Sequence, residues 1–266
     1  MKIIDPRYYQ ITILVTGLLY GQWILDFSLM PLNVVAILIS AQVTQYFFSK
    51  VYCLPVFDPK SALISSLSLC LLLRTNSPWL AVCAAVLAIS SKFILRWREK
   101  HFFNPTNFAL VVMLLTSSVW VSPGQWGATL FFLFASASLA VLVLTRSRST
   151  DITLAFIACY GVMLFSRAYW LGDPFTIPLH NMQNGAFLLF AFFMISDPKT
   201  IPDSRLGRFV FAATVAALAI YIQFYCFNPV GLMYALMICA PLTPLFDIFL
   251  PSKKYEWPVL SASPPK

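Results

Sequence analysis

Asp-Pro and Asn-Pro pairs recur along this sequence, close to the starts of apolar segments. The pairs that we single out begin at Asp58, Asn104, Asp173, Asp197 and Asn228. An aspartate or asparagine side chain accepts hydrogen bonds from the free N–H groups at a helix start, and proline suits the first helical position. We therefore expect each of these residues to open a helix.

These helix starts have two interpretations. In the first, the pairs only cap helices and have no further role. In the second, the helix N-termini converge near the middle of a membrane and present their positive dipole ends to an anion or another polar ligand. The negative charge of an aspartate cap partly cancels the positive field of the helix dipole. Asn104 and Asn228, which carry no charge, are therefore the better candidates to face a ligand.

The six cysteines and two histidines show no pattern that is typical of a metal site. The cysteines are scattered through or beside apolar segments without a C-x-x-C pair, as buried and inert thiols would be. An iron–sulfur cluster shared with a partner subunit is the alternative. No Walker loop, G-x-G-x-x-G, G-x-S-x-G or H-E-x-x-H motif occurs, so any catalysis would belong to a bound cofactor that the protein orients.

The composition indicates that these residues lie in a lipid bilayer. Of the 266 residues, 59% are hydrophobic and only 11% are charged, which is more apolar than a soluble globule can be. The net charge of +8 does not indicate nucleic-acid binding, because the basic residues form short clusters between apolar runs, as cytoplasmic loops do. The predicted fold class is therefore an all-α, polytopic membrane protein.

About ten apolar segments are long enough to cross the bilayer or to enter it. They lie near 9–28, 33–50, 61–73, 78–97, 106–121, 127–145, 151–167, 183–195, 208–225 and 229–249. With both termini in the cytoplasm, sixteen Lys and Arg residues fall on the inner side and only Arg74 and Arg167 on the outer side. This bias supports the number of segments and the orientation with both termini in the cytoplasm. In a bacterium, it predicts that the protein lies in the inner membrane.

The two short segments, 61–73 and 183–195, predict an internal repeat within one membrane domain spanning 1–266. Each is the third segment of a five-segment half, and halves with an odd number of spans face opposite ways. The prediction is a 5+5 inverted repeat, with repeat 1 over about 9–121, repeat 2 over about 127–249 and a cytoplasmic tail over 250–266. Short segments at matching places point to a site between the halves.

Several motifs resemble those of the RnfD/NqrB family, which comprises membrane subunits of ion-pumping, flavin-dependent electron-transport complexes. In the stretch 61–112, the run Lys100-His101-Phe102-Phe103-Asn104-Pro105 matches the family's basic turn followed by Phe-Asn-Pro. In the stretch 185–249, Gly185-Ala186-Phe187 and then Ser196-Asp197-Pro198-Lys199-Thr200 match its Gly-Ala-x-Phe…Asp-Pro-x-Thr signature. The matching stretches cover about half of the chain.

The resemblance implies a ten-helix inverted-repeat fold similar to that of urea transporters, and a flavin (FMN or riboflavin) as cofactor. Members of the family attach FMN to a threonine, and Gly127-Ala128-Thr129 matches the end of that motif. Pro123 and Trp126 stand where the motif has its acidic and hydroxyl residues. The cofactor-binding residues expected in this way are Thr129, Phe103, Asn104, Asn228, Asp197 and Thr200.

Three functions follow as hypotheses from these observations. The first is a membrane subunit of a flavin-dependent electron-transport system, with other membrane redox subunits as partners and with electron transfer coupled to cation movement. The second is a channel or facilitator that takes a small polar solute through the same fold without redox chemistry. The third is a membrane partner in a biosynthetic complex.

Overall fold

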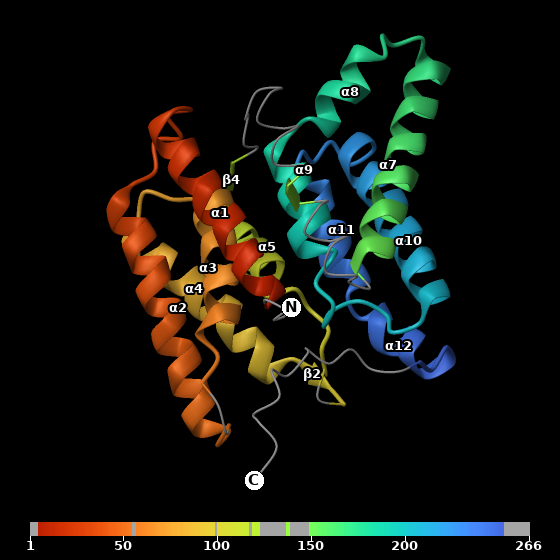
Figure 1. Cartoon of the computed structure of the whole chain (residues 1–266). Coiled ribbons are helices and arrows are strands. Elements are labelled where there is room, and N and C mark those ends of the chain that lie inside the picture. The colour runs from red at the N-terminus through yellow and green to blue at the C-terminus, as the bar shows by residue number, and fades with distance from the viewer. Residues whose placement is uncertain are drawn as a thin grey trace.

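The computed structural model describes residues 5–54, 57–98, 100–116, 119–122, 137–138 and 149–252. Most of these residues are helical, and the helices lie roughly side by side (Figure 1). The predicted segment 127–145 and the predicted tail 250–266 lie almost wholly outside the described residues, and Thr129 is among those outside.

The first part of the chain forms five helices, each of which begins at a proline. They are α1 (Pro6–Trp23), α2 (Pro31–Val51), α3 (Pro59–Leu72), α4 (Pro78–Ile94) and α5 (Pro105–Thr116). Proline is well suited to this position because its missing N–H would find no partner in the first turn anyway, and its fixed φ is already helical. The pattern of proline and apolar runs therefore sets where these helices start.

The second part of the chain contains longer helices and several broken ones. They are α7 (Ser149–Leu171), α8 (Thr176–Met182), α9 (Gly185–Leu189), the π-helical segment η1 (Phe190–Met194), α10 (Arg205–Phe224), α11 (Gly231–Cys239) and α12 (Leu242–Phe249). The predicted segment 183–195 corresponds to α9 and η1, which together span ten residues. The predicted segment 229–249 is not one straight helix, because it bends by 44° between α11 and α12, beside Pro241.

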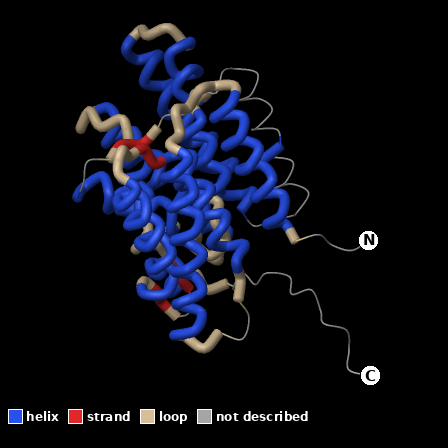
Figure 2. The backbone as a smooth tube through the Cα atoms, turned by 90° about the vertical axis from the view of Figure 1, so that its left-hand side faces the viewer, coloured by secondary structure: helices blue, strands red, loops and turns tan. Residues whose placement is uncertain are grey.

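Two short antiparallel strand pairs close the loops at opposite ends of the helices (Figure 2). β1 (Leu73–Arg74) pairs with β4 (Trp120–Val121), so the ends of α3 and α5 are joined. β2 (Arg96–Trp97) pairs with β3 (Lys100–His101) and forms the turn between α4 and α5. The first pair holds the ends of the short helices α3 and α5 next to each other.

The described helices include several that can cross a membrane. Three are long and apolar enough, namely Pro31–Val51, Thr150–Leu171 and Arg205–Phe224, and the bent pair α11–α12 makes a fourth if it counts as one span. Their burial pattern supports this. In α2, Asn33, Gln45 and Ser49 are buried, whereas Ile39 and Val43 are 58% and 59% exposed. A helix with polar residues inside and apolar residues outside is stable in lipid and not in water. The chain is a helical membrane protein.

The helices pack in the same way in the two parts of the chain. α2 packs against α4 and α4 against α5, while α7 packs against α10 and α10 against α11. The inner faces of α4 and α10 carry fully buried alanines, among them Ala84, Ala88, Ala212 and Ala216. Small residues allow helix backbones to approach closely in a membrane. In Figure 1, α4 runs downward and α10 upward, and α5 contacts α11 where the two parts meet.

Candidate functional site

A polar pocket of about 80 Å³ lies where the short helices begin or end. The starts of α3 and α5, the last turn of α4, the first turns of α1 and the turn after η1 contribute its walls. The residues that line it are Arg7, Gln10, Asp58, Ser61, Ile64, Ser65, Ser68, Lys92, His101, Asn104, Pro105, Thr106, Phe193, Ser196, Asp197, Pro198 and Lys199. Polar and charged side chains dominate this list, although the helices around it are apolar. We call it the central pocket.

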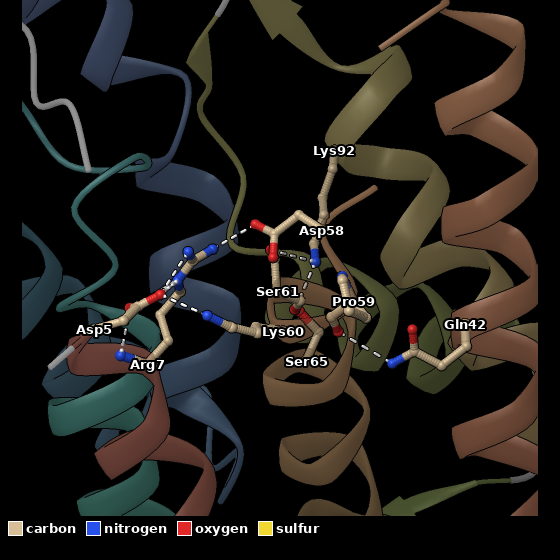
Figure 3. Close-up of polar contacts among 9 residues, drawn as sticks. All are labelled: Asp5, Arg7, Gln42, Asp58, Pro59, Lys60, Ser61, Ser65 and Lys92. Atoms are coloured by element: carbon tan, nitrogen blue, oxygen red, sulfur yellow. Dashed lines mark hydrogen bonds and ion pairs between the residues drawn. The ribbon is translucent and has the colours of Figure 1, made fainter. Parts of the chain in front are cut away.

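A network of four charged residues closes the pocket on the side of α1 (Figure 3). Arg7 pairs with Asp58 and, at 2.7 Å, with Asp5, while the Lys60 ammonium lies 3.0 Å from the Asp5 carboxylate. Burial raises the pKa of Asp5, but the hydrogen bonds from Arg7 and Lys60 lower it more, so this pKa lies well below its ordinary value. The two cations and two carboxylates balance, and the network fastens the start of α1 to the start of α3.

Lys92 reaches into the pocket from the last turn of α4. Its side chain is 7% exposed, and its ammonium donates to the carbonyl oxygen of Ser61 at 3.0 Å and to the Ser61 hydroxyl at 3.1 Å. Figure 3 shows this contact at the first turn of α3. In the sequence, Lys92 belongs with Arg96 and Arg98 to one of the short basic clusters that are typical of cytoplasmic loops. Lys92 does not lie in a loop, because α4 continues to Ile94 and the side chain is buried.

Asn104 connects the two parts of the chain. Its side-chain oxygen accepts from the backbone N–H of Asn107 at 3.0 Å, so it caps α5 as the sequence predicts. Its amide nitrogen donates to the carbonyl oxygens of Phe193 and Met194, at 3.4 and 3.3 Å. These carbonyls end the π-helical segment η1, where the next residues no longer continue the helix. Asn104 therefore satisfies groups at two broken helices at once.

Further bonds from the first part of the chain reach the second beside the pocket. Asn107 is 1% exposed and donates to the carbonyl of Met233 in α11 at 3.1 Å. Lys100 lies 2.8 Å from Asp247 in α12 and 3.1 Å from Asp203, which precedes α10. The sequence did not place Asn107 or Lys100 among the expected site residues, although Lys100 begins the run that resembles the family's basic turn. Their roles could not be predicted, because their partners lie far away along the chain.

His101 and Asp197 face each other across the pocket wall, with 3.9 Å between the imidazole Nε2 and a carboxylate oxygen. Burial lowers the pKa of His101 more than the carboxylate raises it. Burial raises the pKa of Asp197, but His101 and the backbone N–H of Lys199 lower it more, and this pKa ends below its ordinary value. The arrangement holds a neutral imidazole beside an ionised carboxylate.

The prediction that Asp197 opens a helix is wrong. Its carboxylate accepts from the backbone N–H of Lys199 at 3.1 Å and so stabilises a turn, and α10 begins only at Arg205 with Ser204 as its cap. Asp58 does precede α3, but its side chain makes no capping bond there, because it pairs with Arg7. At Asp58, the Arg7 guanidinium competes with the free N–H groups for the carboxylate. At Asp197, the chain forms a turn and no helix follows directly.

The remaining expected site residues are spread over the molecule. Phe103 lies next to Asn104 and contacts the rings of Phe102 and Phe108, but it does not line the pocket. Thr200 is 4% exposed and donates to the carbonyl of Asp197 at 3.2 Å, directly behind the pocket wall. Asn228 accepts from the Val230 N–H at 3.0 Å and stabilises the turn before α11, whose N-cap residue is Val230, so it does not cap that helix. It is not among the pocket residues.

The central pocket does not fit a flavin. Sites for ligands of that size usually have volumes of about 300–1,000 Å³, whereas this pocket has about 80 Å³. It is large enough for a few water molecules or a small ion, since one water occupies about 30 Å³ in the liquid. A flavin would have to be held elsewhere on the chain.

Comparison with known proteins relates the chain to one group. Residues 118–256 match the model of the NQR2, RnfD, RnfE family. The RnfD protein of the ion-translocating oxidoreductase complex of Tolumonas auensis is 36% identical over 87 residues, which is 33% of this chain and 25% of that protein. The protein of the same name from Erwinia tasmaniensis is 28% identical over 138 residues, which is 51% of this chain and 36% of the relative.

A longer but weaker similarity covers most of the chain. The RnfD protein of Pseudomonas paraeruginosa is 24% identical over 255 residues, or 73% of this chain and 74% of that relative. The alignments with the Tolumonas and Erwinia proteins, in contrast, span only about a quarter and about a third of those relatives' own length.

Proposed function

Because the chain belongs to the NQR2, RnfD and RnfE family, we propose that it is an integral membrane subunit of a flavin-dependent electron-transport complex. The observation that carries this proposal is the family match over residues 118–256, slightly more than half of the 266 residues. The relatives are named as subunits of an ion-translocating oxidoreductase complex. We extend this assignment to the present chain, with other membrane redox subunits as partners and with electron transfer coupled to cation movement.

We also propose a ten-helix architecture with two oppositely oriented halves of five helices each. Three observations support it. The packing of α2, α4 and α5 is matched by that of α7, α10 and α11. Short apolar helices, α3 and α9–η1, occur at corresponding places of the two halves. α4 and α10, which correspond in this scheme, run in opposite directions in Figure 1. The excess of basic residues on one side supports cytoplasmic termini and, in a bacterium, the inner membrane.

Within this architecture, Asn104 in the central pocket and two residues beside it hold the halves in register. Asn104 and Asn107 bind backbone carbonyls of the second half, and Lys100 pairs with Asp203 and Asp247. Bonds of this kind are needed because a broken helix in lipid has no water to satisfy its free carbonyls. Asn104, Asn107 and Lys100 therefore serve the junction between the halves.

For the flavin, we propose covalent FMN at Thr129. The support is the match of Gly127-Ala128-Thr129 to the family motif and the family assignment itself. When bound, the flavin would supply the electron-accepting chemistry that the protein's own side chains lack.

An intact-mass measurement tests the flavin. The chain, expressed together with a flavin transferase, is expected to carry the mass of one FMN less one water, and Thr129→Ala is expected to lose it. Thr214→Ala is the matched control, because this exposed hydroxyl on α10 bonds only within its own helix, to the carbonyl of Val210. A wild-type chain without added mass and without flavin fluorescence would eliminate the covalent attachment.

Isolation of the chain from its native membrane tests the assignment to a complex. A tagged chain extracted in mild detergent is expected to bring with it subunits that carry flavin or iron–sulfur absorbance. The facilitator hypothesis predicts instead that the chain alone takes a small polar solute into liposomes. A chain that transports solute alone and retains no redox subunit would refute our proposal in favour of the facilitator.

A further inference from the structure

A second polar pocket, of about 60 Å³, lies at the other end of the short helices from the central pocket. The loop before α2, the first turns of α2, the end of α3 and the strand pair β1–β4 contribute its walls. Asn33, Arg74, Thr75 and Trp120 are among the residues that line it. We call it the outer pocket, because the sequence places Arg74 on the outer side of the membrane.

The Arg74 guanidinium is fixed in this pocket but only partly used. Its Nη1 donates to the carbonyl oxygens of Cys70 and Leu73, at 3.0 and 3.1 Å. The other terminal nitrogen, Nη2, is buried and has no hydrogen-bond partner among the described residues. The ring of Phe27 lies 5.8 Å from the guanidinium carbon and contributes no counter-charge. One donor group of a positively charged side chain is therefore left for an occupant of the pocket.

No described carboxylate balances the charge of Arg74. Among the described residues it forms no ion pair. No described aspartate is near enough to attract it either, in contrast to Lys92, which two carboxylates of the central pocket attract. Arg167, the other basic residue expected on the outer side, has a partner in Asp173 at 3.8 Å. Because burying a charge without a counter-charge is unfavourable, Arg74 calls for an anionic acceptor.

Asn33 adds an unused acceptor to the same pocket. It is 9% exposed, and its amide nitrogen donates to the carbonyl of Thr75 at 2.7 Å, which fixes the orientation of the amide. Its Oδ1 is buried and has no donor among the described residues. Since Thr75 directly follows Arg74, the free acceptor and the free donor belong to one pocket. An occupant that satisfies both and balances the charge must carry an anionic oxygen together with a hydrogen-bond donor.

The depth of the outer pocket in the membrane indicates the source of such an occupant. Trp23 ends α1, Trp79 lies in the first turn of α4 and Trp120 lies in β4, and they are 76%, 78% and 50% exposed. Exposed tryptophans of membrane proteins gather at the level of the lipid headgroups. Met30, which lines the pocket, is 47% exposed, so the pocket reaches the surface at this level. The anionic group that phospholipids present there is a phosphate diester.

We propose that the outer pocket binds the headgroup of an anionic phospholipid, with a phosphate oxygen accepting from Arg74 Nη2 and a headgroup hydroxyl donating to Asn33 Oδ1. The planar, permanently charged guanidinium is well matched to phosphate. The pocket volume of about 60 Å³ accommodates about two water-sized groups. These two oxygens therefore enter, and the rest of the lipid stays outside. Phosphatidylglycerol carries both groups. The site goes beyond the proposed function and needs neither flavin nor a partner subunit.

Native mass spectrometry of the delipidated chain tests the lipid selectivity. The chain is expressed without a flavin transferase, so that no covalent flavin supplies a phosphate. Phosphatidylglycerol is expected to bind about ten-fold more tightly than phosphatidylcholine, whose choline group adds a positive charge and has no donor. Phosphatidylmethanol keeps the negative charge but lacks the hydroxyl, and its affinity should lie between the two. Equal binding of the three lipids would leave the pocket to bridging water molecules and would overturn the proposal.

Thermal unfolding distinguishes a lipid from a free anion. Because a ligand that binds only the folded state stabilises it, phosphatidylglycerol is expected to raise the Tm of the delipidated chain. Inorganic phosphate at equal ionic strength is expected to leave Tm unchanged, since it lacks the acyl chains that hold the headgroup at this depth. Equal stabilisation by both would assign the pocket to a free anion and overturn the lipid site.

Variants then locate the site. Arg74→Gln is expected to remove most of the ten-fold preference for phosphatidylglycerol, because the charged donor to its phosphate is lost. Arg167→Gln is the matched control and should keep the preference, since Arg167 is also an outer arginine but is already paired with Asp173. An unchanged preference in Arg74→Gln would contradict the assignment. If that variant does not fold, wild-type crystals grown with phosphatidylglycerol decide the question. Phosphate density beside Arg74 Nη2 supports the site, and water alone at that place refutes it.

Discussion

Replacement of Asn104 offers the sharpest test of how the two parts of the chain are joined. Asn104 is 6% exposed, and its side chain makes three hydrogen bonds, one within its own helix start and two to the end of η1. In Asn104→Ala, the cap of α5 is lost and the carbonyls of Phe193 and Met194 lose their side-chain donor. Asn104→Asp keeps an oxygen that can cap α5 but removes the donor, so it separates the two contributions.

The expected magnitudes follow from these contacts. Loss of an N-cap costs about 1 kcal/mol. The two bonds to η1 are long, at 3.3 and 3.4 Å, and side-chain hydrogen bonds within membranes average about 0.6 kcal/mol each. Asn104→Ala should therefore lower the free energy of unfolding by about 2 kcal/mol. Asn104→Asp loses the two donor bonds alone, about 1 kcal/mol, and the new carboxylate facing two carbonyls adds to that loss.

Steric trapping in lipid bicelles measures these free energies of unfolding under native-like conditions. Asn76→Ala is a suitable control, because Asn76 is an exposed asparagine at the other end of α3. The control should change stability by less than about 0.5 kcal/mol. If Asn104→Ala is no worse than this control, the bonds to η1 do not hold the two parts together, and our account of the junction is refuted.

Three further predictions concern topology, the junction and pH. Cys53 and Cys226 are both exposed. In variants that keep only one of them, a membrane-impermeant maleimide added to sealed inside-out vesicles should label Cys53 and not Cys226. Labelling of both cysteines from one side would exclude the inverted repeat. Lys100→Met should leave the buried Asp203 and the half-buried Asp247 without a cation and cost about 3 kcal/mol. A loss of under about 0.5 kcal/mol in the same unfolding assay would contradict this. Burial holds the pKa of His101 in the folded chain below 6.5, its ordinary value. As pH falls, the unfolded chain therefore binds a proton at His101 before the folded chain does, and the free energy of unfolding should decrease between about pH 7 and 5. His101→Gln should flatten that dependence, and an unchanged slope would show that another group titrates.

The ionised state of Asp197 gives this pH dependence a second phase. Its pKa lies below the ordinary aspartate value of 3.8, so its contribution to stability is present above that value and is lost as pH falls further. The two groups therefore act in separate pH ranges, although they face each other at 3.9 Å.

The π-helical segment supplies carbonyl oxygens to polar side chains from other helices. A π turn changes the pairing of successive carbonyls, and here Thr153 donates to the Ala191 carbonyl and Asn104 to those of Phe193 and Met194. Such segments occur frequently at functional sites. In this protein the segment fixes where the short helix α9–η1 ends, and thus where the wall of the central pocket lies.

The amino-acid sequence alone was sufficient for the features that depend on local composition and local bonds. The apolar segments predicted a helical membrane protein, because lipid requires long apolar helices whatever their neighbours are. The pair Asn104-Pro105 predicted the start of α5, since Asn104 bonds to the Asn107 N–H only three residues away. Asn228 lies just before α11 but forms a turn and does not cap that helix. The ten-helix count, the inverted repeat and the flavin at Thr129 stay predictions.

Only the tertiary structure decided which charges meet. Lys92 looked like one more basic residue near a loop, but its partner Ser61 lies 31 residues earlier in the chain. Asp197 looked like a helix cap, but His101, from the other part of the chain, and its own turn take up its carboxylate. A side chain's partners depend on which helices pack together, and its charge in the folded protein depends on how completely they exclude solvent. Neither is encoded in the spacing of residues along one segment.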